Sequence, residues 1–287
     1  MFILDYEYIK ATNDLGDHLE VPGVTREDTI TNCFLPNVSE IVLTQRTAVL
    51  YAGGFSIHQS ETRDLPPTDY RYNGSISAGK SSMVIKESTV NSLHKWIGSM
   101  VNNELVNYAT INSNTCASAM FSLFEAEMLL KSQMCDEVII IAEERTSANT
   151  LRIFKEHRID ITCSDGFAVI RLTRDKGTHE IVNTKWSYSY NTNPFRTTKE
   201  GYSAIDTTEV DNINPHGTGT ESNNLAEADL LEGRNVLAYK KDIGHSQGVS
   251  GLLELCMTIE DPKAIGDTLC VASGLGGFYG SCILRKH

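Results

Sequence analysis

Five consecutive apolar residues, Val138-Ile139-Ile140-Ile141-Ala142, limit the architecture of this chain more than any other segment. The run is rich in β-branched residues, which favour strands. It does not alternate with polar residues, and this predicts a strand covered on both faces, as in α/β proteins. Residues 117–131 before it have a largely apolar helical pattern, and residues 167–172 after it form another strand pattern. The chain is therefore predicted to have an α/β fold.

Strand and helix patterns alternate along both halves of the sequence. The further strand patterns are residues 41–43, 47–54, 107–114, 210–214, 235–238, 268–273 and 281–284, and the further helical patterns are residues 82–102, 223–232 and 248–259. Residues 173–208 have weak periodicity and are predicted to be a connection. In each half a strand pattern leads to a reactive residue, Cys116 in the first and His216 in the second. We therefore predict two half-domains of similar layout, residues 1–172 and 173–287.

Composition excludes several classes of protein. The chain has 287 residues, 40% hydrophobic and 22% charged, as expected for a globular protein. The formal net charge of −12 argues against a general nucleic-acid binder, whose surface is usually basic. No segment approaches the roughly 20 apolar residues of a membrane span, and Asp5 and Glu7 lie where a signal peptide carries positive charge. A cytoplasmic protein without a membrane span is expected.

The cysteines argue against a metal or disulfide framework. The chain has 7 cysteines, an odd number, and none of them forms a CxxC pair. A structural zinc site and a disulfide-stabilised fold are both poor fits to this pattern. No metal is therefore expected, and the cysteines are expected to be reduced.

Cys116 is the first candidate for chemistry. It lies between a predicted strand and an apolar helix, in Asn114-Thr115-Cys116-Ala117-Ser118. Backbone N–H groups and the helix dipole at such a position would lower the pKa of a thiol and activate it as a nucleophile. A small buried cysteine that packs at a helix start is the ordinary structural alternative.

Two histidines follow, each beside a glycine. His216 begins His216-Gly217-Thr218-Gly219-Thr220, where small residues would let a bulky substrate or cofactor arm approach the backbone. His245 follows Gly244 at the entry to a glycine-rich helix, with Lys240 before it and Glu254 after it. A turn histidine and a solvated lysine are the structural alternatives. Glu254 fits that view poorly, because an acid within an apolar helix usually needs a partner.

Taken together, the order Cys…His…Lys…His resembles the β-ketoacyl synthases, the elongating ketosynthases of the thiolase-like superfamily. The resemblance runs from residue 107 to the C-terminus, with equivalents at residues 49–54. Its motifs are Thr115-Cys116-Ala117-Ser118, His216-Gly217-Thr218-Gly219-Thr220 with Glu227, Lys240…Gly244-His245 with Glu254, the acidic glycine turn Ser164-Asp165-Gly166, and Ser273-Gly274-Leu275-Gly276-Gly277. The resemblance implies a thiolase-like layered α-β-α-β-α fold made of two related halves.

The resemblance also implies a mechanism. Cys116 would take an acyl group from a thioester on the phosphopantetheine of an acyl carrier protein, or from coenzyme A. His216 and His245 would then hydrogen-bond a malonyl thioester while carbon dioxide leaves, and the enolate would give a 3-oxoacyl product.

Supporting groups follow from the same resemblance. Lys240 would set the electrostatics around His216, with Glu227, and Glu254 would hold Lys240. The amides of Cys116 and Ser273, next to Gly274, would form the oxyanion hole. No bound cofactor or metal is required.

Several departures concern substrate handling. The chain is short for the family, and the spacings from Cys116 to His216 and from His216 to His245 are compressed. Ser273 is expected to replace the family's gating phenylalanine, and Tyr279 the asparagine that ends the glycine-rich turn. The acyl pocket is therefore expected to be more open, or to be completed by another chain.

Partners and alternatives follow from these features. The resemblance implies a homodimer or a heterodimer with a related ketosynthase-like subunit. Docking of an acidic carrier protein would need a local basic patch, for which the candidates are Arg145, Arg152, Lys155 and Arg158.

Two alternative functions stay open: a ketosynthase-like acyltransferase without condensation, and a non-catalytic, chain-length-factor-like subunit. A Cys/His hydrolase would leave the second histidine and the lysine unexplained. A dinucleotide site is a poor fit, because Tyr279 stands where GxGxxG needs its last glycine.

Overall fold

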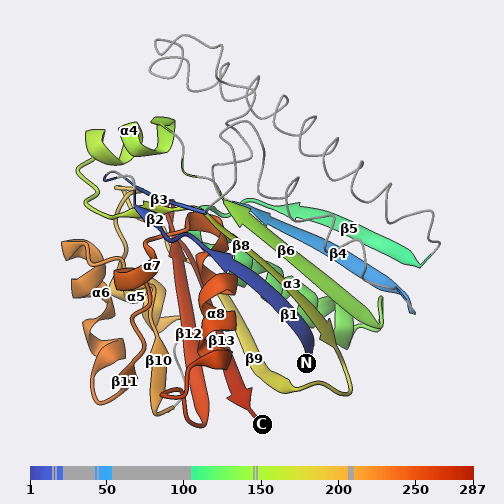
Figure 1. Cartoon of the computed structure of the whole chain (residues 1–287). Helices are drawn as coiled ribbons and strands as arrows, with labels where there is room; N and C mark the ends of the chain where they lie inside the picture. Colours follow the sequence, from blue (N-terminus) through green and yellow to red (C-terminus); the bar gives the residue numbers. More distant parts are fainter. Residues whose placement is uncertain are drawn as a thin grey trace.

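The structure is a computed structural model that describes residues 1–14, 16, 18–21, 43, 45–53, 105–144, 146, 148–205 and 210–287 (Figure 1). The predicted helix over residues 82–102 and most of the predicted strand over residues 41–43 lie outside the described residues.

Ten strands of the described chain form one mixed sheet, in the order β11-β10-β12-β13-β9-β1-β8-β6-β4-β5 (Figure 1). Their bounds in chain order are β1 (Phe2–Lys10), β4 (Thr47–Gly53), β5 (Val106–Asn112), β6 (Glu137–Glu144), β8 (Gly166–Thr173), β9 (His179–Tyr188), β10 (Asn212–Asn214), β11 (Asn235–Val236), β12 (Asp267–Gly274) and β13 (Phe278–Lys286). Strand β6 lies inside the sheet. Ile140 packs into one hydrophobic cluster and Ile139 into another, so β6 is buried on both faces, as the apolar run predicts.

The sheet consists of two sets of strands with the same topology. In β5-β4-β6-β8-β1 and in β11-β10-β12-β13-β9, the first two pairings are parallel and the last two antiparallel. The two sets meet where β1 pairs with β9 through Phe2↔Glu180 and Ile3↔His179. The chain passes from one set to the other between β8 and β9, directly after Thr173.

The same repeat places two helices at the centre of the molecule. Helix α3 (Ser118–Lys131) follows β5, and helix α8 (Ser250–Glu260) follows β11 and the short α7 (Lys240–Ile243). They pack against each other and share one hydrophobic cluster with strands of both sets. Each begins with a short 3-10 turn, η2 (Thr115–Ala117) or η3 (Gln247–Val249), and the two turns are in contact. Residues at the starts of both helices are thereby brought together.

The remaining elements surround this centre. Helices α5 (Lys199–Ser203) and α6 (Glu221–Leu231) cover the second set of strands, and α4 (Ala148–Glu156) lies beside a small sheet of β2 (Asn13–Asp14), β3 (His18–Glu20) and β7 (Cys163–Ser164) (Figure 1). Residues 173–208 were predicted to be a connection without regular structure, and this is wrong for residues 179–188, which form β9. Residues of β9 are only intermittently buried, so the strand lacks the alternation that identifies strands in a sequence.

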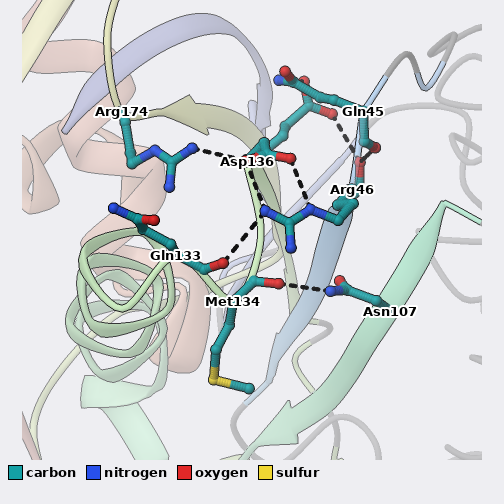
Figure 2. Close-up of polar contacts among 9 residues, drawn as sticks. Gln45, Arg46, Asn107, Gln133, Met134, Asp136 and Arg174 are labelled. Carbon is teal, nitrogen blue, oxygen red and sulfur yellow. Dashed lines mark hydrogen bonds and ion pairs between the residues drawn. The ribbon is translucent and has the colours of Figure 1, made fainter.

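Polar contacts fix the starts of β4 and β6 (Figure 2). The Arg46 guanidinium donates to Asp136 Oδ2 at 3.0 Å, and Arg174 donates to Asp136 Oδ1 at 2.7 Å. Asn107 Nδ2 donates to the Met134 carbonyl oxygen at 2.6 Å, which ties β5 to the end of α3. Exposed ion pairs contribute at most about 1 kcal/mol each, so these contacts set strand register more than overall stability.

Candidate active site

The predicted nucleophile lies at the turn between β5 and α3. Cys116 is 4% exposed and belongs to η2, which Thr115 enters with a φ of 53°. The Ser118 hydroxyl accepts from Asn114 N at 2.8 Å, and the Thr115 hydroxyl donates to the Leu275 carbonyl oxygen at 3.1 Å. Two side chains of the first half and one backbone carbonyl of the second half thus hold this turn in place.

A cleft of about 860 Å³ brings the three predicted reactive residues together. Cys116, His216 and His245 all line it, although they are far apart in the sequence. The two imidazole rings are 5.2 Å apart between centroids and meet edge to face. The cleft therefore joins one thiol and two imidazoles around a single space.

Glu227 positions the backbone of the first histidine. Its carboxylate accepts from the amide of His216 at 2.7 Å, from the amide of Gly217 at 3.0 Å, and from the side chain of Asn223. The pKa of Glu227 is raised above its usual range, because the effect of burial exceeds the opposing effect of these hydrogen bonds. His216 Nδ1 is buried and has no hydrogen-bond partner among the residues that the structure describes. Glu227 thus fixes the turn that presents the imidazole.

The second histidine is held by the small sheet. His245 N donates to the Thr162 carbonyl oxygen at 2.8 Å, and Ser164 N donates to the His245 carbonyl oxygen at 3.1 Å. The ring Nδ1 lies 3.0 Å from the Ser250 hydroxyl, which fixes the orientation of the imidazole.

Lys240 and Glu254 form a buried ion pair, with side chains 7% and 3% exposed. Burial raises the pKa of Glu254, and the Lys240 ammonium opposes that rise. Burial, and secondly the charge of Lys240, hold the pKa of His216 and of His245 well below the usual range. Both imidazoles are therefore neutral at neutral pH.

The predicted low thiol pKa of Cys116 is wrong for this structure. Burial is the largest cause and the Glu144 carboxylate the next, and together they raise the pKa of Cys116 to about 12. Lys240 and a hydrogen bond from the Leu275 backbone oppose this rise without reversing it. The sequence-based prediction considered the helix dipole, which lowers a thiol pKa. Complete burial and a nearby acid, which raise it, cannot be recognised from the local sequence. The resting side chain is a neutral thiol.

The glycine-rich segment at the end of β12 meets the nucleophile turn through its backbone. It is the Leu275 backbone that hydrogen-bonds Cys116, whereas the Ser273 hydroxyl lies 3.0 Å from the hydroxyl of Tyr202. A Cβ atom on Gly274 would lie 2.4 Å from Thr115 Oγ1, so only glycine allows this approach to the nucleophile turn. Ser273, Gly274 and Leu275 all line the cleft. Leu275 was missed, and its position directly after Gly274 was the available signal.

Two other predicted residues lie outside the cleft lining. Asp165 is buried and accepts from Thr146 N at 2.7 Å, so it orders the turn between β7 and β8. Tyr279 is 1% exposed, and its hydroxyl accepts from Thr198 N at 2.8 Å.

Among the described residues, no cluster of His, Cys, Asp and Glu could hold a metal, and no helix is long and apolar enough to cross a bilayer.

We expect Gly244→Ala to destabilise the protein more than Gly233→Ala. Both glycines have positive φ, 73° and 74°, which costs a residue with a side chain about 1–2 kcal/mol. A Cβ atom on Gly244 would also lie 3.0 Å from Ser164 Cβ, whereas no atom of the described part of the chain lies within 4 Å of one on Gly233. Overpacking of this kind costs a further 1–3 kcal/mol, roughly. Urea denaturation measures both variants, and equal losses of stability would contradict the expectation.

One protein-family model matches part of the chain. Residues 199–261 match the family model described as "Beta-ketoacyl synthase, C-terminal domain". That segment contains His216, Glu227, Lys240, His245 and Glu254. No curated protein matches the sequence.

Solved structures match nearly the whole chain. A structure of the ketosynthase ApeO in complex with its chain length factor ApeC, from Xenorhabdus doucetiae, matches with a TM-score of 0.69 and 14% identity, covering 100% of this chain and 98% of that one. A β-ketoacyl synthase from Burkholderia phymatum STM815 has a TM-score of 0.68 and 16% identity, with 94% and 88% covered. AntDE:AntF, a type II PKS acyl-carrier protein in complex with its ketosynthase, has a TM-score of 0.67 and 14% identity, with 98% and 92% covered.

These matches identify the fold. The chain has the thiolase-like ketosynthase fold, which confirms the predicted α/β class. The predicted resemblance to the β-ketoacyl synthases is also confirmed, by the family model over residues 199–261 and by the ketosynthase structures that share this fold.

Proposed function

We propose that this protein is a β-ketoacyl synthase that condenses an acyl group with a malonyl thioester, in fatty-acid or polyketide-type biosynthesis. The observation that carries the proposal is the cleft in which Cys116, His216 and His245 converge, with neutral imidazole rings 5.2 Å apart. A single nucleophile with two neutral hydrogen-bonding imidazoles suits acyl transfer followed by enolate stabilisation.

The first step loads the enzyme. The sulfur of Cys116 attacks the thioester carbonyl, the carbon–sulfur bond to the carrier breaks, and the carrier thiol leaves with a proton. Because Cys116 is a neutral thiol at rest, its proton needs an acceptor. The neutral imidazoles that line the same cleft can take it and return it to the leaving thiol.

The second step forms the carbon–carbon bond. His216 and His245 donate hydrogen bonds to the carbonyl oxygen of the malonyl thioester. The bond to the carboxylate breaks, carbon dioxide leaves, and its electron pair forms the enolate. The enolate carbon then attacks the acyl carbonyl on Cys116, the thiolate leaves, and a 3-oxoacyl thioester remains on the carrier. We assign the oxyanion hole to the amides of Cys116 and Leu275, in place of Ser273, because the Leu275 backbone is already hydrogen-bonded to the sulfur.

An acyl carrier protein is the proposed partner at the mouth of the cleft, which presents positive charge. Arg158 and Arg196 are exposed and line it. Of the basic residues predicted from the sequence, Arg152 pairs with Glu156 at 2.8 Å, and Arg145 lies outside the described residues. An acidic carrier would be attracted to this rim, and its phosphopantetheine would reach Cys116 without any bound cofactor.

A homodimer, or a heterodimer with a related subunit, is also proposed. Strand β5 is the last strand at one side of the sheet that the described residues form, and an edge strand is a template for pairing with another chain. Met128 on the adjoining helix α3 is 56% exposed. We propose the cytoplasm as the location.

Product analysis tests the proposal. The protein is mixed with an acyl carrier protein, its acyl form and its malonyl form, and carrier-bound products are identified by mass spectrometry. A 3-oxoacyl carrier is expected, together with one carbon dioxide per product. Acyl transfer to another acceptor without carbon dioxide release would indicate an acyltransferase. An inactive chain that gains activity only with a ketosynthase would indicate a chain-length-factor-like subunit.

A further inference from the structure

A series of buried hydrogen bonds leads from the end of β12 to the turn that carries His216. The Ser273 hydroxyl lies 3.0 Å from the hydroxyl of Tyr202, which lies 2.7 Å from Asn223 Oδ1. Asn223 Nδ2 then donates to Glu227, the acid that accepts from the His216 amide. The four side chains of this series are each 1% exposed, so their contacts are shielded from solvent.

The hydrogen bonds of this series run in one direction. A carboxylate only accepts, so Glu227 takes the NH2 group of Asn223, and Asn223 Oδ1 faces Tyr202. Because a carbonyl oxygen also only accepts, the Tyr202 hydroxyl donates its single proton to Asn223. The Ser273 hydroxyl is left to donate to Tyr202. Buried hydrogen bonds aligned in this way strengthen one another.

Tyr202 is the member of the series that connects three separate elements. It belongs to α5, whereas Asn223 belongs to α6 and Ser273 to β12. Its ring packs edge to face on Tyr279, with centroids 5.1 Å apart, and a Cβ atom on Gly201 would lie 2.2 Å from the Tyr279 ring. This close packing fixes the position of the Tyr202 hydroxyl.

Tyr202 can affect the reactive groups only through its neighbours. Asn223, Ser273 and His216 line the cleft, whereas Tyr202 is buried and is not among the lining residues. Without the tyrosine hydroxyl, Asn223 Oδ1 would be a buried acceptor that has lost its donor, which is costly, and the amide would turn to find another. Such a turn would remove the donor that Asn223 gives to Glu227.

We propose that Tyr202 is a positioning residue for His216: its hydroxyl orients the Asn223 amide, which in turn holds the Glu227 carboxylate against the turn that presents the imidazole. Ser273, expected in the place of the family's gating phenylalanine, serves as the first donor of this series. The inference rests on the proposed function for the role of His216 in condensation, but its first test uses no substrate, so the two can fail separately.

The first test measures backbone amide chemical shifts of the ¹⁵N-labelled protein by NMR. Tyr202→Phe keeps the ring and removes only the hydroxyl. The amide signals of His216 and Gly217, both held by Glu227, are expected to move in this variant. A smaller movement is expected in Ser273→Ala, which removes only the first donor of the series.

The second test separates two rates. Tyr202→Phe is expected to lower the condensation rate by about three- to tenfold, the size of one neutral hydrogen bond, and to leave loading of Cys116 unchanged. A merely structural role would lower both rates. Asn223→Ala is also expected to lower condensation, and adding Tyr202→Phe to it is expected to cause no further loss, because Tyr202 acts through Asn223.

Tyr8→Phe is the matched control for both tests. The Tyr8 hydroxyl donates to Glu260 Oε2 at 2.5 Å, and neither residue lines the cleft. Both amide signals and both rates are expected to match those of the wild type.

Three results would overturn the proposal. The first is unmoved signals of His216 and Gly217 in folded Tyr202→Phe, or in Ser273→Ala if Tyr202→Phe does not fold. The second is an equal loss of loading and condensation in Tyr202→Phe. The third is an additive loss in the double variant with Asn223→Ala. If the wild-type protein does not condense acyl groups at all, the proposed function fails, and the amide signals still decide whether Tyr202 positions His216.

Discussion

Glu254→Gln is expected to lower the free energy of unfolding by about 3–5 kcal/mol, because it leaves the buried ammonium of Lys240 without its counter-charge. Both side chains are less than one-tenth exposed, so water cannot replace the lost partner. Chemical denaturation measures the loss. Glu260→Gln on the same helix is the matched control, since Glu260 is exposed, and it is expected to change stability by about 0.5 kcal/mol or less.

The double variant Lys240→Met/Glu254→Leu separates the charge from the packing. Apolar side chains of similar volume often replace a buried ion pair without loss of stability, so this variant is expected to recover most of what Glu254→Gln loses. Equally small losses of unfolding free energy in Glu254→Gln and Glu260→Gln would contradict the expectation that Lys240 depends on Glu254 as its buried counter-charge.

His216→Ala is expected to lower the condensation rate by about 10²- to 10³-fold, the usual effect of removing one hydrogen bond to a developing oxyanion. Loading of Cys116 is expected to persist. Rapid-quench measurement of product and acyl-enzyme distinguishes the two steps. His157→Ala is the control, because His157 lines the same cleft but is exposed and stacks on Phe195, and its rate is expected to stay within a few-fold of wild type, roughly.

The pH dependence follows from the low pKa of both histidines. A histidine whose pKa is lowered stays neutral down to a pH below its ordinary value, so its hydrogen-bonding form is complete at and above about pH 6.5. The histidine contribution to condensation is therefore expected to be constant from pH 6.5 to 8 and to fall only in more acid solution. An increase centred near pH 6.5 that disappears in His216→Ala would contradict this.

The sequence predicts most elements of the fold, but not all of them. The apolar run in β6 and the helical patterns that became α3, α6 and α8 were enough to predict the α/β class. Strand β9 was missed, because its residues alternate too weakly to be recognised without the neighbouring strands.

The site residues were predicted by motif, whereas their electrostatics were not. Cys116, His216, His245, Lys240 and the acids that hold them follow from short motifs with characteristic glycines. The raised pKa of Cys116 depends on burial and on Glu144, a residue distant in sequence that reaches the site through β6. The hydrogen bond from Leu275 likewise depends on how β12 approaches η2. Interactions between residues so far apart in the sequence leave no local pattern.

The central claim is that Cys116 carries the acyl group. Intact-protein mass spectrometry after incubation with acyl carrier proteins of several chain lengths is the most direct measurement. The account predicts a gain of one acyl group, mapped to Cys116, absent in Cys116→Ala and retained in Cys163→Ala, whose cysteine is equally buried nearby. No loading at any chain length, or loading that survives Cys116→Ala, would contradict it.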